Sequence, residues 1–375
     1  MSQLYLDYQS TTPLDPAVLA AMMPYLSENF ANPHSAHSSG RKAHAAVDVA
    51  RAHIATLIGA PHDDVIFTSG ATESNNLALK GVILQAPPSK RRIVTLATEH
   101  SCVLETARYL ESVGAPLTIV PVTRNGLVDM GAYREAMGDD VALLSVMAVN
   151  NEIGVIQPLA ELAALAQRHG ALVHCDAAQG VGKIALDVEA LGIDLLSVSG
   201  HKIYAPKGIG ALYVRKGLKL TPHMHGGGQE GAGLRAGTLA PFLCVALGEA
   251  ARLAALRLAQ DGAHAAHCWD MFTAEMAQAP VRINGDSDAR WKGNINLLLP
   301  VAASRLLSKL RRIDMSTGAA CAATAGRPSH VLAALGLSAR EVGQSLRIGW
   351  GRFTQVEDVV RAARAICAAL AELKV

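Results

Sequence analysis

Three parts of the sequence carry side chains that are suited to covalent and acid–base chemistry. Cys321 lies in a run of small residues, Ser316 to Arg327, that offers nothing bulky to pack and is typical of a loop presenting its thiol. Lys202 follows an apolar run and precedes a Pro-Lys-Gly turn, so partial burial would make its amine a nucleophile. Asp176 ends another apolar run. The plainer interpretations are a buried structural cysteine, a solvated turn lysine and a loop cap, and Lys207 suits the second of these better than Lys202 does.

A further stretch, Ser69 to Asn76, suits a phosphate group. It follows the run Val65 to Thr68, and its small residues and hydroxyls open a predicted helix, whose free backbone N–H groups attract anions. Taken alone, it is more typical of an ordinary Ser/Thr helix cap than of a phosphate site. A carboxylate such as Asp176 could keep a pyridine nitrogen protonated and make the ring an electron sink. This phosphate loop, then Asp176 and then Lys202, each after a strand, is the order that a pyridoxal phosphate (PLP) enzyme of the aspartate aminotransferase fold needs.

Short β-rich runs alternate with helical segments over the first two thirds of the chain. Such alternation predicts an α/β fold with a mostly parallel central sheet covered by helices on both faces. Ligand sites in these sheets gather at the carboxyl ends of the strands, which is where the segments above stand. The predicted strands are Val65 to Thr68, Ile93 to Ala97, Leu117 to Val122, Ala142 to Val149, Ala171 to Cys175, Leu195 to Val198 and Gly210 to Val214.

A second, smaller α/β domain is expected toward the C-terminus. A long helical segment from Leu239 to Ala277 precedes predicted strands at Asn294 to Leu299 and Ser345 to Ile348, with helices around and after them. We therefore predict a large domain over 16–250. The small domain would consist of 1–15 and 251–375 and would carry the Cys321 loop.

Composition and charge exclude several classes of protein. The 375 residues are 50% hydrophobic, and 34 Lys+Arg against 32 Asp+Glu leave a net charge of +2, which gives no field for nucleic acid or an anionic membrane. No basic leader and no apolar run of about 18 residues occurs, so we expect a cytoplasmic protein. The pair His34/His37 has metal-like spacing without an acidic or thiol partner, and no resident metal is expected. We interpret the five other cysteines as structural: Cys102, Cys175, Cys244, Cys268 and Cys367.

Ten motifs, in order along nearly the whole chain, resemble those of the cysteine desulfurases of the NifS/IscS type, which belong to the class-V aminotransferases and have the type-I PLP transferase fold. Each motif alone is weak evidence for this family, and the order of all ten along the chain makes the resemblance specific. They are Asn32-Pro33-His34-Ser35, Gly70-Ala71-Thr72-Glu73-Ser74, Thr98-Glu99-His100, Val149 to Gly154, Asp176-Ala177-Ala178-Gln179, Ser199-Gly200-His201-Lys202, His225 to Glu230, Arg235-Ala236-Gly237-Thr238, Cys321 followed by Pro328 to Leu332, and Arg347 followed by Gly351 to Thr354.

The resemblance implies a role for each matching residue. Lys202 would bind the PLP cofactor as an imine and move the substrate Cα proton, and His100 would stack on the ring and take part in catalysis. Asp176 would pair with the ring nitrogen, Gln179 would donate to the ring hydroxyl, and Asn151 would lie beside the ring. Arg347 and Asn32 would hold the substrate carboxylate. The phosphate would be held by Ala71, Thr72, Ser199 and His201, and by Thr238 of the neighbouring subunit of a homodimer.

The implied activity converts L-cysteine to L-alanine and leaves the sulfur as a persulfide on Cys321. A sulfur-acceptor protein, such as an iron–sulfur scaffold or a sulfur carrier, would take up this sulfur for iron–sulfur cluster assembly or another thiolation pathway. Whether Cys321 also binds an iron–sulfur cluster transiently is left as an open alternative. Three departures from the family pattern are Ala319 and Ala322 beside the thiol, and Gly349 after Arg347. The alternatives are a selenocysteine lyase, β-lyase or aminotransferase of the same fold, or a partner-binding dimer with a vestigial cofactor.

Overall fold

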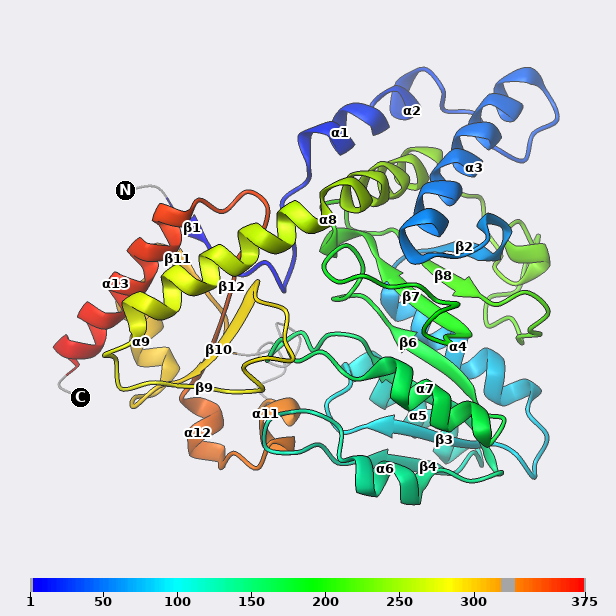
Figure 1. Ribbon diagram of the computed structural model, residues 1–375. Coiled ribbons are helices and arrows are strands. Elements are labelled where there is room, and N and C mark those ends of the chain that lie inside the picture. The colour runs from blue at the N-terminus through cyan, green and yellow to red at the C-terminus, as the bar shows by residue number, and fades with distance from the viewer. Residues whose placement is uncertain (1–2, 318–327, 374–375) are drawn as a thin grey trace.

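The computed structural model describes residues 3–317 and 328–373, and its larger part is built around a seven-stranded sheet (Figure 1). The strand order is β2-β8-β7-β6-β5-β3-β4. Only β8 runs antiparallel to its two neighbours, so the predicted mostly parallel α/β sheet is confirmed. The strands are β2 (Val65–Thr68), β3 (Arg92–Leu96), β4 (Leu117–Val120), β5 (Val141–Met147), β6 (Leu172–Asp176), β7 (Leu195–Ser199) and β8 (Gly210–Val214).

Helices cover both faces of this sheet because successive strand residues point to opposite sides. Leu195 belongs to a core cluster with side chains of α4 and α5, whereas the adjacent Leu196 packs in the cluster formed with α3, α7 and α8. The strands are therefore mostly apolar, as is typical of sheets buried on both faces. The helices are α3 (Ser38–Ile58), α4 (Ala71–Gln85), α5 (Ser101–Ser112), α6 (Met130–Ala136), α7 (Leu159–Arg168) and α8 (Pro241–Met276).

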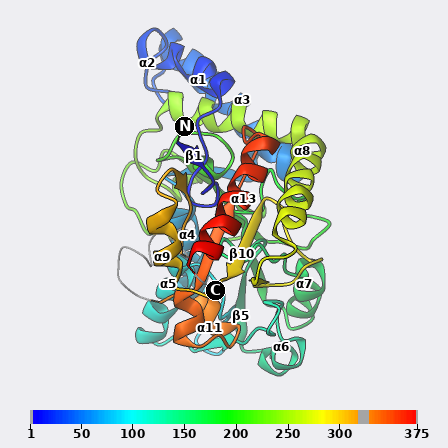
Figure 2. The ribbon, with the colours of Figure 1, turned by 90° about the vertical axis from the view of Figure 1, so that its left-hand side faces the viewer.

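A second region lies at the far end of α8, which extends from the large sheet into it (Figure 1). In Figure 2 this region faces the viewer, with α13 across its front and α1 and α2 projecting at the top. Its core joins Leu4 and Leu6 to residues from Ala265 to Leu370, but the predicted boundaries at 15/16 and 250/251 stay a prediction. The remaining elements are β1 (Leu4–Tyr5), α1 (Pro16–Met22), α2 (Pro24–Ser27), β9 (Arg282–Ile283), β10 (Asn294–Leu298), α9 (Ala303–Lys309), β11 (Ile313–Asp314), α11 (His330–Ala334), α12 (Ala339–Gly343), β12 (Ser345–Gly349) and α13 (Val356–Glu372).

The N-terminal segment joins the two regions. Leu4 and Tyr5 pair in parallel with Ile313 and Asp314, and two residues later Asp7 bridges to Gly349 at the end of β12. The chain then passes the carboxyl end of the large sheet, where the backbone N–H of Thr12 donates to the carbonyl of His201. One short stretch thus contacts both regions before the first helix begins.

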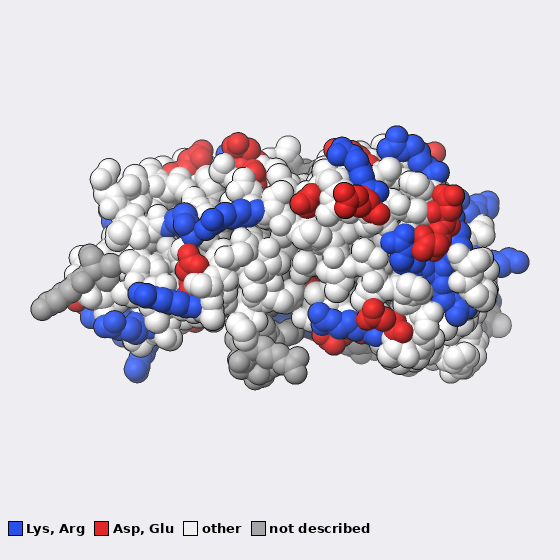
Figure 3. Space-filling model, turned by 90° about the horizontal axis from the view of Figure 1, so that it is seen from below, with Lys and Arg blue, Asp and Glu red and all other residues white. Residues whose placement is uncertain are grey.

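The charged side chains are mixed on one face of the molecule (Figure 3). On the face seen in Figure 3, basic and acidic groups lie interspersed, in keeping with the small net charge. Within the two described ranges, none of the helices combines the length and the apolar character that crossing a membrane would need.

Candidate active site

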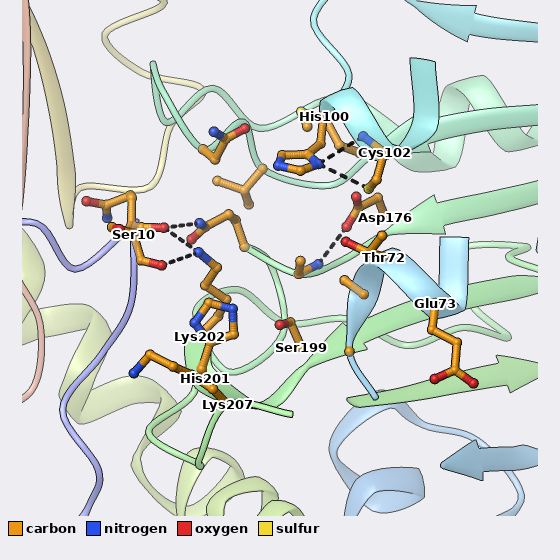
Figure 4. A pocket seen from close by; sticks show the side chains of 18 of the residues that line it. Ser10, Thr72, Glu73, His100, Cys102, Asp176, Ser199, His201, Lys202 and Lys207 are labelled. Atoms are coloured by element: carbon orange, nitrogen blue, oxygen red, sulfur yellow. Dashed lines mark hydrogen bonds between the residues drawn. The ribbon is translucent and has the colours of Figure 1, made fainter. Parts of the chain in front are cut away.

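The carboxyl ends of β2, β5, β6 and β7 open into a cavity of about 430 Å³ (Figure 4). The strands end there on polar residues, as the sequence predicts for a parallel sheet. The site residues predicted from the sequence that line this cavity are Ala71, Thr72, His100, Asn151, Asp176, Gln179, Ser199, His201, Lys202 and Arg347.

Asp176 is the last residue of β6 and is 5% exposed. One of its carboxylate oxygens accepts from Nδ2 of Asn75 at 2.7 Å, and the other accepts from the backbone N–H of Ala178 at 3.0 Å. These two donors fix the position of a carboxylate that the sheet holds at the edge of the cavity. The arrangement suits a cationic partner such as a protonated ring nitrogen.

Lys202 ends a short 3₁₀ turn, Gly200–Lys202, directly after β7. Its Nζ donates to the backbone carbonyls of Gln9, at 2.6 Å, and Ser10, at 2.7 Å (Figure 4). The N–H of Ala205 donates to the carbonyl of Gly200, which closes this turn. The amine is therefore held inside the cavity and is not the solvated turn lysine of the alternative interpretation, whereas Lys207 is exposed at its rim.

Another part of the cavity lining suits an anion. Gly70 precedes α4 with φ of 149° and has no side chain to cap the first turn, where Ala71 and Thr72 lie. This 15-residue helix directs its N-terminal dipole at the cavity. Ser199 and His201 face it from the end of β7. Burial, followed by the charge of Lys202, lowers the pKa of His201 to about 4, so the imidazole is neutral at pH 7.

Arg347 on β12 reaches the cavity from the second region and is 1% exposed. Its Nη2 lies 2.8 Å from Oδ1 of Asp7, and its Nη1 donates to the carbonyl of Asn151 at 3.2 Å. The other oxygen of Asp7 accepts from the hydroxyl of Ser316 at 2.8 Å. Nε of Arg347 is buried without a partner in the described part of the chain, which leaves a donor for a substrate carboxylate.

Gln179 lies beside Lys202 in a shared hydrogen-bond network. Its Nε2 donates to the carbonyl of Gln9 at 2.9 Å, and its Oε1 accepts from Nζ of Lys183. Because a carbonyl can only accept and an ammonium group can only donate, the orientation of the Gln179 amide is fixed. Burial, with smaller contributions from the charges of Lys202 and Arg347, lowers the pKa of Lys183 to about 7.

Two predicted residues do not line the cavity, and one lies outside the described residues. Asn32 is exposed in the loop between α2 and α3, where its Oδ1 accepts from the N–H of His34. Thr238 is exposed before α8. Cys321 falls in the segment 318–327, outside the described ranges.

The cavity also contains residues that the sequence reasoning missed. Cys102, which we expected to be a structural cysteine, instead lines the cavity, and its Sγ lies 3.0 Å from Nδ1 of His100. Gln9 and Ser10 contribute the carbonyls that receive the Lys202 amine, and Asn75 holds Asp176. Asn75 lies within the Ser69 to Asn76 segment, which the sequence already singles out. The carbonyls of Gln9 and Ser10 could not be found in this way, because every residue has a backbone carbonyl.

The fold and this site define the class of protein. Residues 4–361 match the family model described as aminotransferase class-V, so the chain belongs to that family. A curated relative from Rickettsia bellii (strain OSU 85-389), named cysteine desulfurase IscS, is 46% identical over 377 residues, which cover 99% of this chain and 92% of the relative.

Solved structures agree over nearly the whole chain. A NifS-like protein superposes with a TM-score of 0.92 at 32% identity and covers 99% of this chain and 100% of its own. SspA in complex with cysteine superposes with a TM-score of 0.85 at 36% identity, covering 94% of this chain and 100% of its own.

Proposed function

We propose that this protein is a cysteine desulfurase that converts L-cysteine to L-alanine and transfers the sulfur through a cysteine persulfide. The observation that carries the proposal is one cavity that holds a buried carboxylate, Asp176, an amine, Lys202, and a buried guanidinium, Arg347. The names of the similar proteins above support the same activity. The family and the relatives' activity point generally to pyridoxal phosphate as the cofactor.

The residues of the cavity fit pyridoxal phosphate. The first turn of α4, with Ser199 and His201, suits its phosphate, and the buried carboxylate of Asp176 suits its pyridinium nitrogen. Lys202 would hold its aldehyde carbon, and the amide of Gln179, which lines the cavity, would supply an N–H group to its ring hydroxyl. When bound, this cofactor withdraws electrons from the substrate Cα.

The protein's own groups then divide the work on L-cysteine. Arg347 would bind the substrate carboxylate with the N–H groups that do not contact Asp7. This contact would fix the orientation of the bonds at the substrate Cα within the cavity. The amine of Lys202 would take the Cα proton and return it to the substrate skeleton. Asp176, which two hydrogen bonds hold at the edge of the cavity, would support that step by pairing with the ring nitrogen.

We propose Cys321 as the sulfur acceptor on the strength of the family resemblance alone. Its thiolate would attack the substrate sulfur, a new S–S bond would form, and the Cβ–S bond would break. The electron pair of the broken bond stays on the carbon skeleton and is protonated, which gives alanine. The balance is L-cysteine plus the Cys321 thiol giving L-alanine plus the Cys321 persulfide, which a sulfur-acceptor protein or an added thiol would then reduce.

A second copy of the chain belongs to this proposal. Thr238 is exposed and does not line the cavity of its own chain, which supports its assignment to the phosphate site of a partner in a homodimer. We assign the substrate carboxylate in this chain's cavity to Arg347 and keep Asn32 as an untested contributor. The cytoplasmic location, the iron–sulfur or thiolation pathway and a transient cluster on Cys321 remain predictions.

The test is the release of alanine and sulfide from L-cysteine in the presence of dithiothreitol. We compare wild type with Cys321→Ser and Lys202→Ala, and use Cys367→Ser, a partly buried cysteine on α13, as the matched control. Wild type and Cys367→Ser should release the two products in equal amounts. Cys321→Ser should retain the yellow cofactor absorbance but lose both products, and Lys202→Ala should lose the activity as well.

Three outcomes would overturn the proposal. Full activity in Cys321→Ser would indicate a β-lyase or a selenocysteine lyase, and amino-group transfer to a keto acid without sulfide would indicate an aminotransferase. A wild type that binds the cofactor but turns over none of these substrates would indicate a partner-binding dimer with a vestigial cofactor.

A further inference from the structure

The thiol of Cys102 lies between His100, which lines the cavity, and Asn75, which binds Asp176. It stands on the first turn of α5, whose N-cap is His100, and its Sγ lies 3.0 Å from Nδ1 of that histidine (Figure 4). On its other side, Sγ accepts a hydrogen bond from Nδ2 of Asn75 at 3.1 Å. The same Nδ2 donates to Asp176 at 2.7 Å. One chain of contacts therefore runs from Asp176 to His100 through Asn75 and Cys102.

The donors at Asn75 and at the backbone of Cys102 fix the directions of the bonds at the two ends of this chain. A carboxylate only accepts, so the amide nitrogen of Asn75, and not its oxygen, faces Asp176. The second amide hydrogen of Asn75 points to the sulfur, so the thiol hydrogen of Cys102 is available for Nδ1 of His100. Nδ1 also accepts from the backbone N–H of Cys102 at 3.2 Å. Two donors directed at one nitrogen leave no room for a proton on it.

We propose that Cys102 is a positioning residue that, together with Asn75, keeps His100 as the neutral imidazole whose proton lies on Nε2. Building a proton on Nδ1 would bring it against the thiol and the backbone N–H at once, so the charged imidazolium is disfavoured. His100 then offers the reaction a hydrogen bond from Nε2 and no basic nitrogen at Nδ1. The proposal deepens the proposed function, because it assigns the Cα proton to Lys202 and excludes Nδ1 of His100 as a base.

The surroundings of His100 agree with a neutral ring. Burial lowers the pKa of His100, and the nearby positive charge of Lys202 acts in the same direction, whereas Asp176 opposes both. Burial raises the pKa of the Cys102 thiol to about 12, so the sulfur keeps its hydrogen at neutral pH. The charged and titratable groups that act on the ring come from four separate segments: Asp176, Lys202, His330 and Glu152.

The experiment follows the ring nitrogens of His100 in the holoenzyme by long-range ¹H–¹⁵N correlation of protein labelled with ¹⁵N-histidine. His100→Gln identifies the resonances. Wild type should show a protonated Nε2 and a bare Nδ1 that does not titrate between pH 6 and 8.5. Cys102→Ser, which keeps a donor, should give the same pattern. Cys102→Ala should raise the apparent pKa of His100 by about one unit, the shift expected for losing one weak hydrogen bond.

Further variants make the test decisive. Cys102→Asp replaces the donor with an acceptor and should move the proton onto Nδ1, which tests the proposal even if Cys102→Ala folds poorly. Cys367→Ala is the control for losing a partly buried thiol elsewhere and should leave His100 unchanged. A proton on Nδ1 in wild type, or a His100 that Cys102→Ala and Cys102→Asp both leave unaltered, would overturn the proposal. The measurement needs no turnover, so an inactive wild type would refute the desulfurase proposal while the state of His100 could still be determined.

Discussion

The carboxylate of Asp7 lies 2.8 Å from a guanidinium nitrogen of Arg347, although the two residues stand 340 positions apart in the sequence. The same carboxylate accepts from Ser316. The backbones of Ser316 and Arg347 also pair directly, with one N–H of each donating to the carbonyl of the other. Asp7 therefore fixes the orientation of the buried guanidinium that we assign to the substrate, and it does so from outside the cavity lining.

Asp7→Asn should destabilise the protein, because it leaves the guanidinium of Arg347 buried without a counter-charge. We expect a loss of about 2–4 kcal/mol in the free energy of unfolding, below the full cost of breaking a buried pair because Asp7 is partly exposed. Urea denaturation measures this change. Glu372→Gln, which breaks the exposed pair with Lys309, is the control and should leave the midpoint unchanged. Equal midpoints for wild type and Asp7→Asn would show that the pair is energetically neutral.

Gly210→Ala should weaken both the fold and the binding of pyridoxal phosphate. A Cβ at Gly210 would lie 2.4 Å from the carbonyl oxygen of Val198 and 2.6 Å from Cα of Gly70, and neither backbone atom can move aside cheaply. The displaced Gly70 begins the helix turn that we assign to the phosphate. We expect a lower melting temperature and at least a tenfold higher dissociation constant for the cofactor, roughly 1.4 kcal/mol, measured by fluorescence titration of the apoprotein.

Gly262→Ala supplies the matched control for that substitution. Gly262 lies within α8, and an added Cβ would meet nothing within 4 Å. Alanine is favoured over glycine inside a helix by roughly 0.5–1 kcal/mol, so this variant should be slightly more stable and should bind the cofactor normally. A Gly210→Ala protein that behaves like Gly262→Ala would contradict the close approach described here.

Gly349 and Gln9 should be energetically coupled. A Cβ at Gly349 would lie 1.5 Å from Oε1 of Gln9, whose backbone carbonyl receives Lys202. Gly349→Ala should cost about 1–3 kcal/mol of stability, as overpacking typically does, and Gln9→Ala should relieve most of that cost. Unfolding of the two single variants and the double variant gives the coupling, which we expect to exceed about 1 kcal/mol. Additive effects would mean that Gln9 simply rotates away.

The lowered pKa of Lys183 predicts a stability that depends on pH. Between about 7, its pKa in the folded protein, and its ordinary value of 10.5, the unfolded chain binds a proton that the folded protein has lost. The free energy of unfolding therefore rises with pH over this window, and the cost of burying the charged amine is greatest below pH 7. Lys183→Met removes this dependence, so its stability advantage over wild type should be largest at pH 6 and shrink toward pH 10.

Urea denaturation at a series of pH values measures that difference. Lys216→Met is the control, because Lys216 is exposed at the far end of β8. A constant gap between wild type and Lys183→Met from pH 6 to pH 10 would show that the amine titrates normally.

The sequence predicted the strands well, because a buried strand is a short, mostly apolar run. Val65 to Thr68 and Gly210 to Val214 are strands over the predicted residues. The antiparallel direction of β8 was not predictable, since an apolar run reads the same in either direction. The helix predicted from Leu239 begins at Pro241, where a proline suits the first helical turn.

The candidate site was predictable only where chemistry resides in the residue type. Asp176 and Lys202 follow strands and have reactive side chains, so their positions in the sequence identified them. Gln9 acts through its backbone carbonyl, which every residue has, and Cys102 follows a helical pattern that also describes a structural thiol. Contacts such as Asp7 with Arg347 join segments from the two ends of the chain, and no local pattern encodes them.

The position of Asp7 also has a consequence for biosynthesis. A ribosome adds about 5–20 residues per second, so roughly 20–70 s pass between the synthesis of Asp7 and that of Arg347, which lies 340 positions later. The residues from Leu4 to Asp7, whose partners lie on β11 and β12, therefore reach their places only after those strands have been synthesised, whereas the contact of Thr12 with His201 needs only the large sheet. The nascent chain can thus form the sheet that bears Asp176 and Lys202 well before it contains Arg347, which we assign to the substrate carboxylate.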